Sequence, residues 1–125
     1  MQKYKDLIQK IKDLRTEAKK EAQAALQTGF KDFFAKYPDL ESISWMQFTP
    51  YFNDGDTCEF CVYSDVELNG EEYWDDPKMP KEAYKEISEF VSMFDEDDML
   101  AVYGDHAKVV ILRDGTTEVN DYEHD

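Results

Sequence analysis

Residues 42–56 read SISWMQFTPYFNDGD and combine a strand pattern with a turn. Side chains alternate along 43–52, a period of two that predicts a β-strand with both faces partly apolar. Pro50 has no amide proton for a ladder, so we expect this strand to be at a sheet edge or bulged near its end. The Asn-Asp-Gly run at 53–55 then turns the chain back. One alternating set is Ile43, Trp45, Gln47, Thr49 and Tyr51, and the other is Ser44, Met46, Phe48, Pro50 and Phe52.

The chain continues from this turn with a second alternating segment. Asn69-Gly70 is another tight-turn dipeptide, and it allows a short third strand over 72–74. We therefore expect a three-stranded antiparallel β-meander. The face of the second strand that points to the core is formed by Cys58, Phe60, Val62, Ser64, Val66 and Leu68.

The rest of the acidic part predicts helices and a hairpin. Pro80 suits the first turn of a helix, and Asp95 the start of a second one that ends at Gly104. Asp114-Gly115 turns a final hairpin between residues 107–112 and 116–119. The first of these helices would bury Tyr84, Ile87, Phe90, Val91 and Phe94.

The N-terminal part predicts one long helix. Apolar residues recur every three or four positions from Tyr4 to Leu26, while Lys, Gln and Glu fill the opposite face. A helix over 1–38 would be roughly 50 Å long, so its first half projects, pairs with another copy, or folds back at a kink near Gly29. The fold class is thus α+β: a long N-terminal helix, a meander, a second helix region and a C-terminal hairpin.

Composition favours one globular domain with two electrostatic parts. Hydrophobic residues make up 42% of the 125 residues, which is ordinary for a folding chain. Residues 1–38 hold nine bases and five acids, a net charge of +4, and residues 39–125 hold five bases and twenty-four acids, a net charge of −19. The sum of −15 argues against direct binding of nucleic acid, where Lys and Arg neutralise phosphates.

The start of the chain predicts neither a signal peptide nor a membrane span, because residues 1–15 hold no unbroken apolar run. The two cysteines, Cys58 and Cys61, are too few for a disulfide framework. We therefore expect a protein of the cytoplasm with both thiols reduced and no membrane partner.

Cys58-Glu-Phe-Cys61 could supply a zinc site with His106 and His124. On a strand, however, residues three apart point to opposite faces. We expect Cys58 to be a small buried residue, with no bound zinc and no other cofactor. The acidic turn at 53–56 lacks the ligand spacing of a calcium-binding EF-hand.

An enzyme is not the expected class. Carboxylate clusters can hold Mg²⁺ for hydrolysis, but such sites place a basic residue beside the phosphate, and few bases follow Pro38. His106 follows Gly104-Asp105, where its plainest role is to bond Asp105. A metal-dependent hydrolase stays an alternative, using Asp54, Asp56, Glu59 and His106.

Two motifs resemble a group of small proteins encoded by bacteriophages and bacteria. The first runs from Trp45 to Asp56, followed by Cys58 and Phe60. The second combines Gly104-Asp-His106, Arg113-Asp-Gly115 and the ending Tyr122-Glu-His-Asp125. The resemblance implies a phage accessory protein, or a bacterial relative of one, in the host cytoplasm. It carries over no activity and no catalytic residue.

The acidity exceeds what solubility requires of a small domain. Spaced carboxylates can imitate the field of a nucleic-acid backbone. We therefore expect an accessory protein that binds, through acidic and aromatic side chains, the basic surface of a host nucleic-acid-handling or defence protein and inhibits it. The alternative is an assembly protein whose N-terminal helix forms a homodimer. The expected binding residues are Glu71, Glu72, Tyr73, Trp74, Asp75, Asp76, Asp95, Glu96, Asp97 and Asp98.

Overall fold

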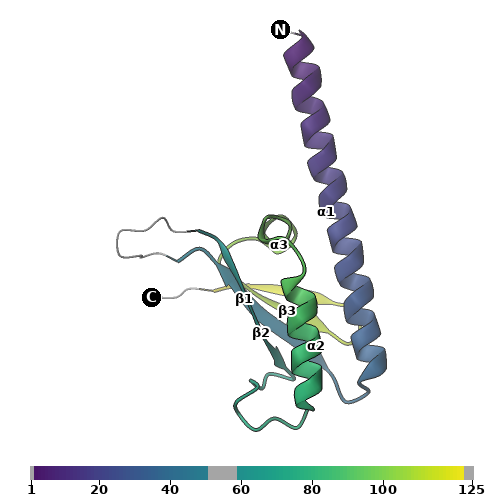
Figure 1. The fold of residues 1–125 in the computed structure, drawn as a ribbon, viewed down its shortest axis with the longest axis vertical. Helices are drawn as coiled ribbons and strands as arrows, with labels where there is room; N and C mark the ends of the chain where they lie inside the picture. The colour runs from purple at the N-terminus through teal and green to yellow at the C-terminus, as the bar shows by residue number, and fades with distance from the viewer. Residues whose placement is uncertain (1, 51–58, 123–125) are drawn as a thin grey trace.

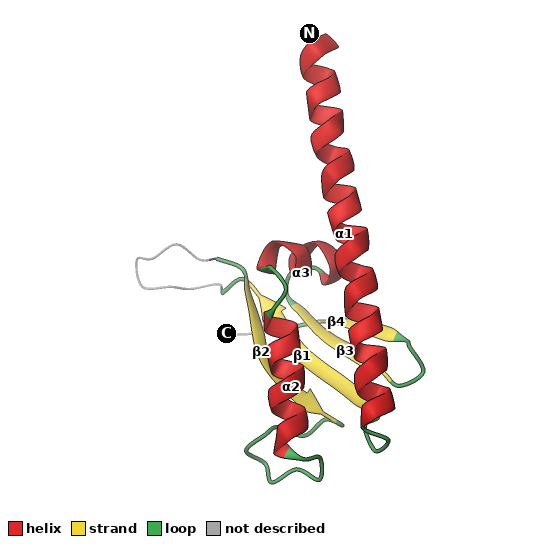
Figure 2. Cartoon of the chain, turned by 45° about the vertical axis from the view of Figure 1, so that its right-hand side comes forward, coloured by secondary structure: helices red, strands yellow, loops and turns green. Residues whose placement is uncertain are grey.

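The computed structural model describes residues 2–50 and 59–122, with side chains from Tyr4 onward. It has the expected α+β class, with a single four-stranded antiparallel sheet in the order β2-β1-β3-β4 (Figure 1). Two helices lie on one face of that sheet, and a third crosses one end of it (Figure 2). The elements are α1 (Gln2–Lys36), β1 (Ser42–Phe48), β2 (Cys61–Leu68), α2 (Lys81–Ser92), α3 (Glu96–Tyr103), β3 (Ala107–Leu112) and β4 (Thr117–Asp121).

Strand β1 is central, not at an edge. It pairs with β2 on one side and with β3 on the other, and its register shifts between Ser44 and Met46. Pro50 lies beyond the strand end at Phe48, so the missing amide proton costs no ladder bond. Of the two arrangements expected from Pro50, the edge position is wrong, and the irregularity that β1 does have lies between Ser44 and Met46, not beside Pro50.

The expected third strand of the meander is also absent from the described residues. After the turn at Asn69 and Gly70, Glu71 makes a single bridge to Leu68, and the following residues form turns. The outer edge of β2 is already occupied, because the amide of Val62 donates to Glu96 Oε2 (2.8 Å) and that of Val66 to Ser88 Oγ (3.4 Å). The C-terminal hairpin joins β1 instead.

The core lies between the sheet and the helices. Trp45, 2% exposed, stacks on Phe30 of α1 with 5.6 Å between ring centroids. The opposite sheet face is also partly apolar, as Phe48 stacks on Tyr63 at 4.4 Å. The alternation in residues 42–48 thus predicted both faces correctly. The sheet and α2 bury Ile43, Trp45, Gln47, Val66, Leu68, Val109, Ile111, Tyr84, Ile87 and Val91.

Helix α1 runs unbroken through Gly29, so the alternative in which the helix folds back at this residue is not observed. The glycine instead makes room for Phe90 of α2, whose ring a Cβ on residue 29 would overlap. Residues from Ala22 onward contribute to the core, while the first half of the helix projects beyond the body (Figures 1 and 2). Of the arrangements considered for this half, projection is the one observed.

The C-terminal end of α1 is held by a side chain far away in sequence. Arg113 Nη1 donates to the carbonyl oxygens of Phe34 (2.9 Å), Leu40 (2.9 Å) and Tyr37 (3.3 Å). These carbonyls belong to the last turn of the helix and the segment after it, which a cation stabilises. Arg113 therefore ties the end of α1 and the segment after it to the end of β3.

Candidate partner-binding site

A groove opens between β2, α2 and the loop 71–80. Its volume is about 480 Å³, and we call it the aromatic groove. Trp74 is 67% exposed and Tyr73 is 44% exposed, so both rings offer apolar surface to solvent. The lining residues are Asp65, Val66, Glu72, Tyr73, Trp74, Lys81, Glu82, Tyr84, Lys85 and Ser88. The groove therefore combines an aromatic surface with three carboxylates and two ammonium groups.

The loop that carries these rings is tied to α2. Tyr84 OH donates to the Glu71 carbonyl at 2.6 Å, and the amide of Lys78 donates to Glu71 Oε2 at 3.1 Å. Burial raises the pKa of Tyr84, so its hydroxyl keeps the proton that it donates. The edge of Tyr84 also contacts the Tyr73 ring, with 5.9 Å between centroids. Glu71 thus holds the loop, and Glu72, Tyr73 and Trp74 face the groove.

The positive groups of the groove were not among the expected site residues. Lys81 Nζ lies 5.5 Å from the centroid of the Tyr73 ring, within range of a cation–π contact. Lys85 follows one turn later on α2 and lines the same space. Lys81 and Lys85 are four residues apart on the helix that follows Pro80, and this spacing predicts that both lie on one helix face.

The second acidic cluster, Asp95 to Asp98, lies elsewhere. This cluster lies at the start of α3. Helix α2 separates it from the loop 71–80 and is roughly 18 Å long at about 1.5 Å per residue. Glu96 accepts the Val62 amide at the edge of β2, while Asp97 and Asp98 line a separate groove facing Arg15 and Lys19 of α1. The ten expected residues therefore form two patches, not one.

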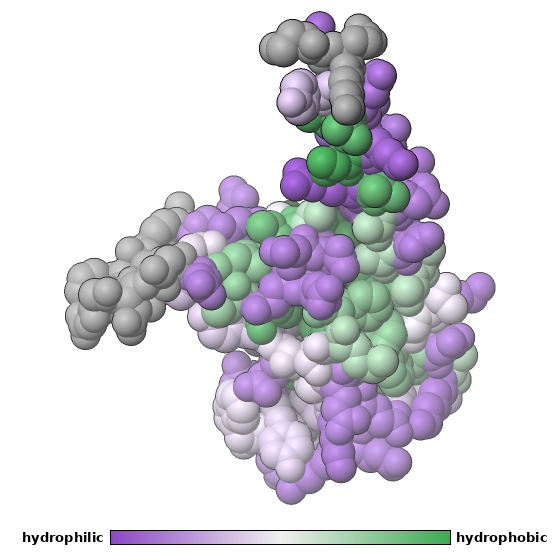
Figure 3. Space-filling model, turned by 45° about the horizontal axis from the view of Figure 1, so that its top comes forward, coloured by the Kyte–Doolittle hydropathy of each residue, from purple (hydrophilic) through white to green (hydrophobic). Residues whose placement is uncertain are grey.

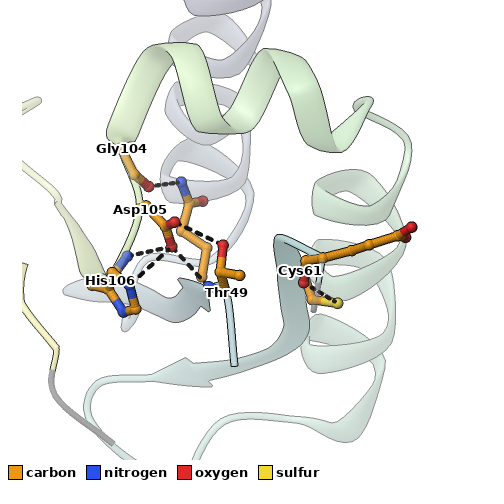
Figure 4. Close-up of polar contacts among 7 residues, drawn as sticks. Thr49, Cys61, Gly104, Asp105 and His106 are labelled. Carbon is orange, nitrogen blue, oxygen red and sulfur yellow. Dashed lines mark hydrogen bonds and ion pairs between the residues drawn. The ribbon is translucent and has the colours of Figure 1, made fainter. Parts of the chain in front are cut away.

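Asp105 forms a third polar cluster at the α3–β3 junction (Figure 4). Its Oδ1 accepts the amides of Thr49 (2.7 Å) and His106 (2.8 Å), and its Oδ2 accepts Thr49 Oγ1 (2.7 Å). Partial burial raises the pKa of Asp105, but these hydrogen bonds and the nearby His106 outweigh it, so the net shift is downward. His106 Nε2 lies 3.9 Å from Asp105 Oδ1, in agreement with the role expected of His106.

The same junction contains a buried amide that the sequence did not single out. Gln47 Nε2 donates to the carbonyls of Met99 (2.9 Å) and Gly104 (2.8 Å), and its Oε1 accepts the indole N–H of Trp45 (3.0 Å). Gly104 ends α3 with a φ of 92°, a positive value that glycine adopts more easily than other residues at the end of a helix. The cluster therefore fastens α3 to β1, and its groups serve the fold.

The thiol and metal candidates find little geometric support. Cys61 begins β2, and burial, with Glu96 and Glu59 nearby, raises the pKa of its thiol, which opposes a thiolate. Within residues 2–50 and 59–122, no three His, Cys, Asp or Glu side chains are grouped as metal ligands would be. Four residues considered for such sites, Asp54, Asp56, Cys58 and His124, lie outside the described residues.

No described helix is both long and apolar enough to cross a bilayer. No protein-family model, no curated protein and no solved structure matches this chain.

Proposed function

We propose that this protein is a binding protein that captures a basic segment of a partner protein in the aromatic groove. The observation that carries the proposal is the exposure of Trp74, 67%, beside Tyr73 at the rim of a groove that also presents Asp65, Glu72 and Glu82. A folded chain rarely exposes two large aromatic rings side by side without a use for them.

The chemistry of the groove suits Lys or Arg side chains. Carboxylates accept hydrogen bonds from a guanidinium or ammonium group, and an indole ring attracts the same cations over its face. Lys81 and Lys85 repel a uniformly basic strip, so they favour a segment in which basic residues alternate with acidic or neutral ones. The groove would thus bind segments selectively by their charge pattern, with Trp74 as the central apolar contact.

The net negative charge of residues 39–125 adds long-range attraction to the contacts in the groove. At −19 over residues 39–125, its field attracts basic partners from a distance, including proteins whose basic surfaces normally bind nucleic-acid phosphates. We propose such a protein as the partner, with occlusion of its basic surface as the effect. This is the inhibitory role expected from the acidity of the sequence, now centred on one groove.

Tryptophan fluorescence offers a direct test, because the chain has two tryptophans and only Trp74 is exposed. Peptides of alternating Arg and Ser residues are titrated into the full chain, with an Arg-only peptide and a Glu/Ser peptide as comparisons. We expect the alternating Arg/Ser peptide to change the emission most. Trp74→Ala should abolish binding measured independently by calorimetry.

Met93→Ala is the matched control, since Met93 is 79% exposed at the far end of α2. This variant should bind like the parent chain. Equal binding of Arg/Ser and Glu/Ser peptides, or undiminished calorimetric binding by Trp74→Ala, would contradict the proposal.

A further inference from the structure

The projecting half of α1 carries a strip of apolar side chains that the body leaves uncovered. Their exposed fractions lie between 49% and 65%, whereas Leu26 further along the same helix is fully buried. Figure 3 shows this strip in green on the projecting helix, bordered by purple hydrophilic side chains. We call it the N-terminal strip; it consists of Tyr4, Leu7, Ile8, Ile11 and Leu14.

The strip follows a heptad pattern and stops where α3 begins to cover α1. Tyr4 and Ile11 fall at a positions and Leu7 and Leu14 at d positions, the spacing of a coiled-coil seam. The next residues, Arg15 and the turn after it, line the groove against α3. The uncovered seam therefore runs from residue 4 to residue 14 and is centred near residue 9.

We infer that this strip packs against the same strip of a second copy of the chain, with the two helices antiparallel. Centring the pair on residue 9 places Tyr4 opposite the partner's Leu14 and Leu7 opposite the partner's Ile11. Ile8, at the flanking e position, lies beside the partner's Ile8. Each apolar residue of the strip then has an apolar counterpart.

Charge favours the antiparallel over the parallel orientation. In a parallel pair the g position of one helix faces the following e position of the other, which sets Lys10 against Arg15 twice. In the antiparallel pair g faces g, so the like-charge contact along the seam is the one between Lys10 and the partner's Lys10. A parallel pair also brings two bodies of −19 side by side. The antiparallel pair places the bodies at opposite ends of the helices, further apart than the screening length of about 8 Å.

The antiparallel pair also joins complementary charges. The first turn of α1 holds no acidic residue, so its positive dipole end is uncompensated within the helix. In this register that end lies level with residue 15 of the partner, at the groove lined by Asp97, Asp98 and Leu100 of α3. Arg15 and Lys19 of the partner's α1 line the other side of this groove, so the helix end meets the carboxylates and Leu100 on the side that α3 forms.

Sedimentation equilibrium of the full chain tests the association. We expect a dimer at tens of micromolar, and Ile11→Asp should raise its dissociation constant by about tenfold or more, because a charge enters the seam. Gln9→Asp, at an outward f position, is the matched control and should leave the dimer intact. A monomeric parent chain, or an unchanged dimer in Ile11→Asp, would overturn the inference.

Cysteine crosslinking tests the orientation, in a chain with Cys58→Ala and Cys61→Ala. Ile8→Cys should crosslink to itself under mild oxidation, and Tyr4→Cys should crosslink to Leu14→Cys when the two are mixed. Leu14→Cys alone should not. Efficient self-crosslinking of Leu14→Cys would show a parallel pair and overturn the orientation.

A third measurement, in the chain with its natural cysteines, tests the contact between the N-terminal end of α1 and the partner's α3. Asp97→Asn with Asp98→Asn should weaken the dimer severalfold at low salt and less at high salt, because screening removes the same attraction. Glu118→Gln with Asp121→Asn, on exposed β4, is the charge-matched control and should have no effect. Equal effects of the two pairs would contradict the contact between the helix end and α3.

Discussion

Gly29 of α1 lies against the ring of Phe90 of α2 so closely that a Cβ on residue 29 would stand 2.6 Å from Phe90 Cε1. Phe90 also contacts Phe30 edge to face, with 5.4 Å between centroids. The absent side chain thus sets the distance between the two helices.

Gly29→Ala is expected to destabilise the fold although alanine is the better helix former. Helix propensity favours alanine by about 1 kcal/mol, but overpacking against Phe90 costs about 1–3 kcal/mol. Urea unfolding should therefore show a lower free energy of unfolding. Thr28→Ala, exposed one residue earlier, should be neutral or stabilising, and Phe90→Leu should make Gly29→Ala less costly. A stabilised Gly29→Ala chain would contradict the close packing.

Arg113→Ala is expected to loosen the end of α1. Three carbonyl oxygens lose a charged donor, at a cost of about 2 kcal/mol or more in the free energy of unfolding. Arg113→Lys should lose less, because it keeps the charge that the helix end favours but not the forked donor. Lys20→Ala, which removes an exposed charge from α1, is the control, and hydrogen exchange at residues 34–40 locates the effect. Equal protection there in Arg113→Ala would refute this role.

Asp105→Asn is expected to change how the free energy of unfolding depends on pH in the acidic range. The pKa of Asp105 is below its ordinary value of 3.8 in the folded chain, so its carboxylate stabilises the fold above that pH. This stabilisation is lost as the pH falls through the lowered value. Asparagine keeps Oδ1 for the Thr49 and His106 amides but does not titrate.

Acid unfolding monitored by circular dichroism should accordingly show a shallower decline below about pH 4 for Asp105→Asn than for the parent chain. Asp32→Asn, an exposed carboxylate of α1, serves as the control and should leave the decline unchanged. Identical acid transitions for the parent and Asp105→Asn would show that the cluster contributes nothing to acid stability.

Local patterns predicted the elements, while long-range pairing decided the topology. The alternation at 42–48 and the run 107–112 identified two strands, but their pairing joins residues about sixty positions apart. In place of the strand expected over 72–74, the edge of β2 bonds to Ser88 at the Val66 amide and to Glu96 at the Val62 amide. Both acceptors belong to helices that follow β2 in the chain, so the residues at 72–74 gave no sign of them.

For the candidate site, the sequence predicted which residues take part but not how they are grouped in space. Trp74 and Tyr73 were identifiable as aromatic residues flanked by acidic ones, although they were expected in a strand, and the structure places both at one groove. The separation of Asp97 from that groove depends on the direction of α2, which sequence spacing alone does not give. Gln47 escaped notice because its partners Met99 and Gly104 lie more than fifty residues away.

The last prediction separates steering from anchoring in the aromatic groove. Reversing Glu72, Asp75 and Asp76 to lysine should slow association with an Arg/Ser peptide, because opposite fields attract over about 8 Å at physiological salt. Glu71 is left unchanged, since it holds the loop through the Lys78 amide. Trp74→Ala should instead speed dissociation, as expected when a central aromatic contact is lost.

Surface plasmon resonance at low and high salt measures both rates. The control is Asp32→Lys with Glu118→Lys and Asp121→Lys, three exposed positions on α1 and on β4 at the sheet edge opposite β2, which changes the net charge equally. If the groove is the binding site, reversal in the loop 71–80 slows association more than this distant reversal does. Equal slowing by the two triple variants would mean that net charge alone attracts the peptide, and a dissociation rate unchanged in Trp74→Ala would remove the anchor from the proposed function.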